Sequence, residues 1–156
     1  MDKVGINRLF RDKGRTLGSV ESFTGGKFAS EITSVSGASH FFKGALVTYA
    51  TEEKQRLLGI SYLDIDQYGV VSKEIAGQMA SNAKKLLNVD YCVSFTGNAG
   101  PEAMEDKPVG EIHIGIAFYD SVQVHSFQLE GSRNEIKDKA INIAFELLEQ
   151  TILQNN

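Results

Sequence analysis

Apolar residues change their spacing along this 156-residue chain, and each change marks an element of secondary structure. Short apolar runs predict buried strands over 16–21, 45–49 and 91–95. Strict alternation predicts a further strand over 112–118, and a short turn then leads into a last strand over 122–129. We expect the last two strands to be antiparallel neighbours.

Apolar residues at helical spacing predict helices before and between these strands. The first helix closes at Lys13-Gly14, with a basic last turn and a glycine just after it. A second helix follows Gly26, and a third begins at Glu52 with Thr51 as its N-cap. The segment 59–69 is polar with single apolar anchors, which indicates a surface linker.

Two longer helices have recognisable start signals. Ser72 is expected to cap one of them, and Ser132 with Glu135 forms a capping box for the other. The apolar faces predicted for these helices are Ile75, Ala76, Met79, Ala80, Ala83, Leu86 and Leu87 in the first, and Ile136, Ala140, Ile143, Ala144 and Leu147 in the second.

Alternating strands and helices that end in a hairpin predict an α/β fold: a three-layer α/β/α sandwich with a mixed, mostly parallel sheet. We expect a single domain over residues 1–156. The net charge of -4 argues against broad attraction to nucleic acid. Cys92 is the one cysteine, so no internal disulfide is possible. No targeting signal or membrane span is recognisable, and we expect a cytoplasmic protein without a membrane partner.

The turn after the first strand, Ser22-Phe23-Thr24-Gly25-Gly26, is the first candidate for chemistry. Adjacent glycines allow positive φ, and the free N–H groups of a helix's first turn attract an anion or an oxyanion. The turn resembles the plan of a nucleophile elbow, although it contains neither G-x-S-x-G nor a P-loop. A phosphate-binding turn, a nucleophile turn and a plain connection all fit this pattern.

Ligands of such folds gather at the carboxyl ends of the strands, where Ser22, Tyr49 and the turn 96–100 are predicted to lie. Ser22 as nucleophile and Lys54 as base, with Tyr49 either between them or on the substrate, would form an acyl-transfer site. The dipole of the predicted helix would lower the pKa of Lys54. The alternative is a solvated lysine, an edge aromatic and a turn hydroxyl.

Other charged or ligating residues give weaker signals. Arg133 begins a predicted helix, where it would bind a phosphate or remain solvated. The three histidines lack the spacing of a metal site, and His113 is predicted to face away from its isoleucine neighbours. The carboxylates of 102–106 suit a cation, but such acidic loops are usually only solvated.

Six motifs and Lys54, in order along nearly the whole chain, resemble the CinA C-terminal domain family, which includes the nicotinamide-nucleotide amidohydrolases (NMN deamidases). These motifs are Glu21-Ser22-Phe23-Thr24-Gly25-Gly26, Gly44-Ala45-Leu46-Val47-Thr48-Tyr49, Gly69-Val70-Val71-Ser72, Thr96-Gly97-Asn98-Ala99-Gly100-Pro101, Lys107-Pro108-Val109-Gly110 and Gly131-Ser132-Arg133. The sequence differs from the family pattern at Phe23, Asn98 and Ser132, where the family commonly has cysteine, an aliphatic residue and an acidic residue.

The resemblance implies hydrolysis of nicotinamide mononucleotide (NMN) to nicotinate mononucleotide and ammonia, with Ser22, Tyr49 and Lys54 as the catalytic residues. It implies a homodimer, an α/β/α sandwich, and no metal or other cofactor. N–H groups near Gly25 and Gly26 would stabilise the oxyanion. The residues that it places around the nucleotide are Thr24, Gly25, Gly26, Gly97, Asn98, Gly100 and Arg133. Two alternatives are a non-catalytic nucleotide-binding module with a role in competence or DNA damage, and an amidase for another nucleotide-like carboxamide.

Overall fold

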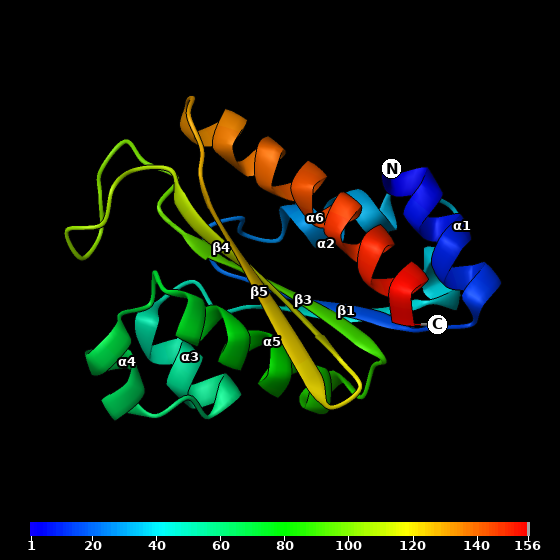
Figure 1. Ribbon diagram of the computed structural model, residues 1–156, viewed down its shortest axis with the longest axis horizontal. Coiled ribbons are helices and arrows are strands. Elements are labelled where there is room, and N and C mark those ends of the chain that lie inside the picture. Colours follow the sequence, from blue (N-terminus) through cyan, green and yellow to red (C-terminus); the bar gives the residue numbers. More distant parts are fainter. Residues whose placement is uncertain (156) are drawn as a thin grey trace.

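The computed structural model describes residues 1–155, which form a five-stranded sheet with helices on both faces (Figure 1). The strands lie in the order β2-β1-β3-β4-β5. The first three run parallel, and the last two are antiparallel to their neighbours. The mixed α/β sandwich expected from the sequence is therefore confirmed. The strands are β1 (Leu17–Glu21), β2 (Phe42–Val47), β3 (Tyr91–Gly97), β4 (Glu111–Phe118) and β5 (Ser121–Gln128).

The helices separate into two groups, one on each side of the sheet (Figure 1). One face is covered by α1 (Lys3–Lys13), α2 (Lys27–Thr33) and α6 (Arg133–Asn155); the other by α3 (Thr51–Leu58), α4 (Tyr62–Tyr68) and α5 (Lys73–Leu87). A single 3-10 turn, Ala38–His40, precedes β2. Among residues 1–155, no helix has both the length and the apolar content needed to cross a bilayer.

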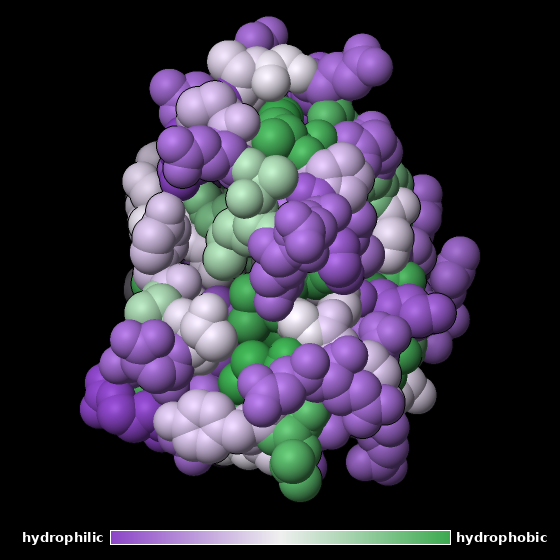
Figure 2. All heavy atoms as spheres, turned by 90° about the vertical axis from the view of Figure 1, so that its left-hand side faces the viewer, coloured by the Kyte–Doolittle hydropathy of each residue, from purple (hydrophilic) through white to green (hydrophobic). Residues whose placement is uncertain are grey.

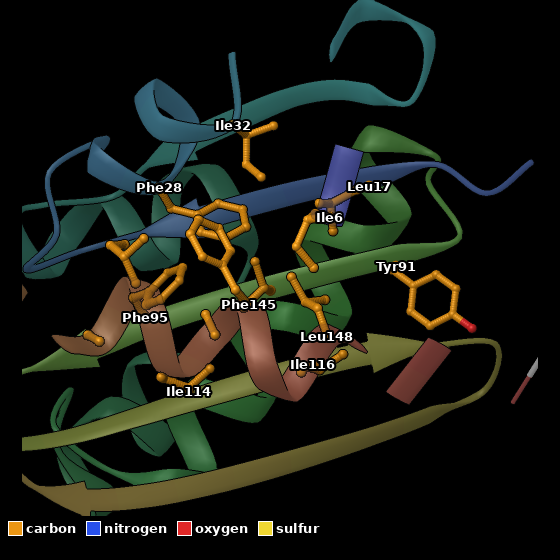
Figure 3. Close-up of a cluster of buried hydrophobic side chains, with 14 of the residues drawn as sticks. Ile6, Leu17, Phe28, Ile32, Tyr91, Phe95, Ile114, Ile116, Phe145 and Leu148 are labelled. Carbon is orange, nitrogen blue, oxygen red and sulfur yellow. The ribbon is translucent and has the colours of Figure 1, made fainter. Parts of the chain in front are cut away.

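The larger of two apolar cores fixes α2 and α6 against the sheet (Figure 3). Phe28 of α2 lies at its centre, with its ring centroid 5.3 Å from that of Phe95 and 5.7 Å from that of Phe145. Such tilted aromatic pairs add specific geometry to the burial of apolar surface. The core therefore holds the start of α2, and with it the turn that follows β1, in a fixed position.

The second core lies between the sheet and α5. Val20 and Cys92 extend from neighbouring strands and share this core with Ile75 and Met79, all four fully buried. The sheet is thus sandwiched between two apolar layers, and its strand ends are fixed from both sides.

Several element boundaries differ from the sequence predictions. The expected linker 59–69 contains the helix α4, whose first turn is capped by Ser61 accepting a hydrogen bond from the Asp64 N–H. Thr51 is the first helical residue of α3, and the N-cap position belongs to Ala50. Strand β2 ends two residues before Tyr49 because pairing with β1 stops at Val47. The sequence prediction missed α4 because its residues are mostly polar. The helix packs on α5.

Two predicted helix starts and most of the predicted buried faces are present. Ser72 caps α5 as expected, and the capping box of Ser132 with Glu135 is present at the start of α6. Leu86 is 60% exposed, however, whereas its neighbour Leu87 packs against the second core. In α6, the side facing the core contains Ile141, Phe145 and Leu148 in place of the predicted Ile143 and Leu147, which are only partly buried.

Candidate active site

The turn after β1 is held by the carboxylate of Glu21, which is fully buried. It accepts hydrogen bonds from the Thr24 hydroxyl at 2.8 Å and from the N–H groups of Phe28 and Ala29 at 3.0 and 3.1 Å. An anion is favourable at a helix N-terminus, and here the chain supplies its own. This arrangement makes α2 unsuitable as a phosphate cradle and leaves Ser22, which lines the adjacent pocket, as the candidate nucleophile of the turn.

Ser22 is fixed through its backbone. Its N–H donates to the Phe95 carbonyl at 3.0 Å, and its carbonyl accepts from the Gly25 N–H at 3.0 Å. The Gly25 N–H is thereby engaged and is not free for an oxyanion. Gly26 has a φ of 100°, a conformation that favours glycine and lets the chain turn directly into α2. Thr24, Gly25 and Gly26 shape this turn, but all three lie outside the lining of the adjacent pocket.

Lys54 meets Ser22 across the space between β1 and α3. Its ammonium nitrogen lies 3.0 Å from Ser22 Oγ and donates to the Thr48 carbonyl at 2.8 Å. The residue is only 1% exposed, and burial lowers the pKa of Lys54 to about 8, an effect that the Glu105 carboxylate partly opposes. The sequence pointed to the helix dipole as the cause, whereas the structure identifies burial. A serine hydroxyl and a lysine of reduced basicity are thus in direct contact.

The pair lies in a pocket of about 440 Å³ at the carboxyl ends of β1 and β3. Phe23 and the segment Val70-Val71 form part of its wall, and the loop 96–104 forms much of the rest. Figure 2 shows this end of the molecule, where hydrophobic surface lies between polar side chains. The volume and mixed lining suit a small ligand with both apolar and charged parts.

Arg133 extends from the start of α6 to the pocket. Its guanidinium donates to the Gly100 carbonyl at 2.7 Å and to the Tyr49 hydroxyl at 2.9 Å. Tyr49 is 59% exposed, so its hydroxyl lies at the pocket's outer part, next to Arg133. Within the described residues, Ser22 and Lys54 bond each other without Tyr49 between them. Tyr49 and Arg133 therefore form a second polar group of the same pocket.

The loop after β3 is shaped by Asn98. Its side-chain amide donates to the carbonyls of Met104 and Lys107, and its Oδ1 accepts from the Met104 N–H at 3.2 Å. Gly97 borders the pocket through its backbone, since a Cβ there would lie 2.7 Å from the Glu111 carbonyl oxygen. The amide atoms of Asn98 that could contact a ligand are thus already used in hydrogen bonds that shape the pocket wall.

Two structurally important carboxylates were missed in the sequence analysis. Glu21 was named only as the first residue of a family motif, although a carboxylate before a helix is a recognised stabilising signal. Glu105, in the loop expected to be merely solvated, accepts from the N–H groups of Val70 and Val71, both at 3.0 Å. No sequence signal revealed that contact, because it joins segments 34 and 35 residues apart.

Neither the histidines nor the acidic residues form a metal centre. Across residues 1–155, no group of three or more histidine, cysteine, aspartate and glutamate side chains has the geometry of a metal site. His113 lies on the sheet face opposite Ile112 and Ile114, as predicted, and its ring nitrogens contact Ser126 at 2.7 Å and Glu111 at 2.9 Å.

A family model described as the CinA C-terminal domain matches residues 3–152. This chain belongs to that family. A CinA-like protein from Flavobacterium psychrophilum is 40% identical over 154 residues, which cover 98% of this chain and 37% of that protein. A putative competence-damage inducible protein from Bacillus subtilis is 40% identical over 144 residues, or 90% of this chain and 35% of its relative. The chain therefore spans little more than a third of these relatives.

Solved structures of CinA-family proteins share the fold. The competence/damage inducible protein CihA from Agrobacterium tumefaciens superposes with a TM-score of 0.91 at 30% identity, covering 95% of this chain and 92% of that one. A competence damage-inducible protein A from Klebsiella pneumoniae gives a TM-score of 0.96 over 99% and 96% of the two chains. At 23% identity, the second comparison supports the fold alone.

Proposed function

We propose that this CinA-family chain is an amidohydrolase that converts NMN to nicotinate mononucleotide and ammonia, with Ser22 as nucleophile and Lys54 as base. The observation that carries the proposal is the 3.0 Å contact between Lys54 Nζ and Ser22 Oγ in a pocket that is open to a small ligand. Serine requires a base at neutral pH, and a buried lysine can serve as one.

The protonation state of Lys54 fits this role. With a pKa of about 8, about one molecule in ten holds the neutral amine at pH 7. That amine takes the Ser22 proton as Ser22 Oγ attacks the carboxamide carbon and forms a tetrahedral oxyanion. Collapse of this intermediate releases ammonia, after the leaving nitrogen receives the proton from Lys54. Water then hydrolyses the acyl-enzyme, with Lys54 again as the base.

The oxyanion donor is assigned to the Phe23 N–H. Phe23 directly follows the nucleophile and lines the pocket, and the residue in that position provides the oxyanion donor in nucleophile turns of other folds. Of the donors expected from the sequence, near Gly25 and Gly26, the Gly25 N–H already bonds the Ser22 carbonyl, and neither glycine lines the pocket.

The phosphate of the nucleotide is assigned to Arg133. A guanidinium presents several donors in one plane, which suits a phosphate, and Arg133 already donates to Tyr49 and Gly100. Tyr49 would orient the arginine and border the sugar. In this arrangement the carboxamide lies toward Ser22 and the phosphate lies toward the pocket's outer part.

The deciding experiment is release of ammonia and nicotinate mononucleotide from NMN by the purified protein, with nicotinamide as a second substrate. Ser22→Ala should reduce turnover by about a thousandfold or more while NMN binding persists, because the nucleophile is lost but the pocket remains. Ser30→Ala, which removes an exposed hydroxyl on α2, is the matched control and should keep full activity. Normal turnover by Ser22→Ala would overturn the mechanism.

The remaining outcomes identify the alternatives. NMN binding without turnover by the unmodified protein would favour a nucleotide-binding module, in line with relatives that are named putative competence-damage inducible proteins. Absence of both binding and turnover would direct the search to another carboxamide, since Phe23 occupies a pocket position where the family commonly has cysteine.

A further inference from the structure

The loop 98–110 connects β3 to β4 and forms one wall of the pocket. Its two ends are joined to each other, because the Gly110 N–H donates to the Asn98 carbonyl at 2.7 Å. The middle of the loop crosses to the other side of the pocket, where the segment Val70-Val71 precedes α5. The pocket wall thus depends on how firmly the loop is attached to that segment.

Two loop residues make the attachment. Glu105 accepts from the N–H groups of Val70 and Val71, and Lys107 Nζ donates to the Val71 carbonyl at 2.9 Å. The backbone at Glu105 and Asp106 has φ values of 55° and 57°, a left-handed conformation that is unfavourable for non-glycine residues. This unfavourable backbone conformation occurs where the Glu105 carboxylate accepts hydrogen bonds from two backbone N–H groups.

The attachment also places a negative charge in the surroundings of Lys54. The Glu105 carboxylate raises the pKa of Lys54 against the larger, opposite effect of burial. Other charged groups on the surrounding elements are Glu21 at the end of β1, Glu52 and Glu53 on α3, Lys73 and Glu74 on α5, Glu102, Asp106 and Lys107 on the loop, and Arg133 on α6.

We propose that Glu105 is a positioning residue of this active site, which fastens the loop 98–110 to Val70-Val71 and places its carboxylate charge in the surroundings of Lys54. The inference rests on the proposed function for its effect on turnover, but the attachment and the electrostatic effect can be measured without it. One carboxylate thereby couples the shape of the pocket wall to the protonation of the base.

The test compares Glu105→Gln with Lys107→Met. Both variants weaken the same attachment, but the first removes a negative charge and the second a positive one. The Lys54 side chain is titrated by NMR in lysine-labelled protein, with its signal assigned through Lys54→Arg. In Glu105→Gln we expect the Lys54 midpoint to move below its wild-type value, whereas in Lys107→Met it should stay or rise.

Turnover provides the second measurement where NMN is a substrate. Because the neutral lysine is the active form, the rising limb of kcat/KM with pH should move to lower pH in Glu105→Gln and not in Lys107→Met. KM for NMN should increase in both variants as the wall loosens. Folded Glu105→Gln with an unchanged Lys54 midpoint would overturn the inference. If the wild-type protein does not turn over NMN but the Lys54 midpoint still moves in Glu105→Gln, only the assignment of NMN as substrate would be contradicted.

Discussion

Lys54 shows how a residue of the candidate site can act against stability. Its side chain is almost fully buried, and its bonds to Thr48 and Ser22 are made by a group that prefers water when charged. In the unfolded chain the pKa of Lys54 is the ordinary 10.5, against about 8 in the folded protein. Below pH 8 the folded state therefore holds a proton that burial disfavours.

Replacement of this lysine by an apolar residue of similar length should stabilise the protein. For Lys54→Met we expect the free energy of unfolding at pH 7 to rise by about 2 kcal/mol, the pKa difference being partly offset by the lost hydrogen bonds. Turnover should disappear because the base is gone. Urea denaturation at pH 7 measures the gain, and Lys73→Met, at an exposed lysine, is the control with little change.

The pH dependence of that gain has a definite sign. Between about pH 8 and 10.5 the unfolded wild-type chain binds more protons at Lys54 than the folded one, so wild-type stability increases with pH in this range. Lys54→Met lacks this titratable group, so its free energy of unfolding does not show this increase with pH. The difference between the two proteins should therefore narrow as the pH is raised from 7 to 10, and a constant difference would contradict a lowered pKa of Lys54.

At the scale of elements, the junction of β1 and α2 depends on Glu21. Its carboxylate replaces the missing acceptors of the first turn of α2 and fixes the Thr24 hydroxyl, all within a buried environment. A seven-residue helix is too short to be stable alone, so the strand end and the helix start form one unit. Ser22 lies at the centre of this unit.

In Glu21→Gln, the side-chain NH2 group would replace one carboxylate oxygen and face the N–H group of Phe28 or Ala29, which is itself a donor. We expect the substitution to lower the free energy of unfolding by about 2 kcal/mol or more, since a buried donor loses its acceptor. Glu31→Gln on the same helix removes only a surface pair with Lys3 and should cost less than about 1 kcal/mol. Equal effects of the two substitutions would contradict the role given to Glu21.

The sequence predicted elements best where one local pattern decides them. Alternation in β4 and the capping box of Ser132 with Glu135 are local, and both are present. Helix α4 was missed because its short sequence, with Leu63 80% exposed, has little apolar periodicity and is stabilised by packing on α5. The buried side of α6 was predicted only in part: Ile136, Ala140 and Ala144 are fully buried, but Ile143 and Leu147 are partly buried, because the sheet also selects which side is covered.

The sequence likewise predicted some features of the candidate site and missed others. Ser22 and Lys54 were identified by type and by resemblance, and the fold brings them into contact. The Glu105 contact depends on how two distant loops meet, and the bond of Arg133 to Tyr49 joins residues 84 positions apart. Contacts of that range follow from the packed fold and have no local sequence signal.

At the scale of the whole molecule, Cys92 reports on the integrity of the fold. It is fully buried in the central strand β3, between Gly18 of β1 and Ala117 of β4, in the core under α5. Burial also raises the pKa of its thiol, so the reactive thiolate is scarce in the native state. A reagent can reach this sulfur only when α5 separates from the sheet, which disrupts the second core.

Labelling of Cys92 should therefore follow global unfolding. In native buffer we expect labelling by a thiol-specific disulfide reagent to be slower than in denaturant by a factor close to the unfolding equilibrium constant. Because this is the chain's single cysteine, the label is unambiguous. Glu21→Gln should accelerate labelling by about 30-fold if it removes about 2 kcal/mol, since each 1.36 kcal/mol is a factor of ten. Rapid labelling of the native wild-type protein would instead show that α5 opens locally, and the pocket wall that begins at Val70-Val71 would open with it.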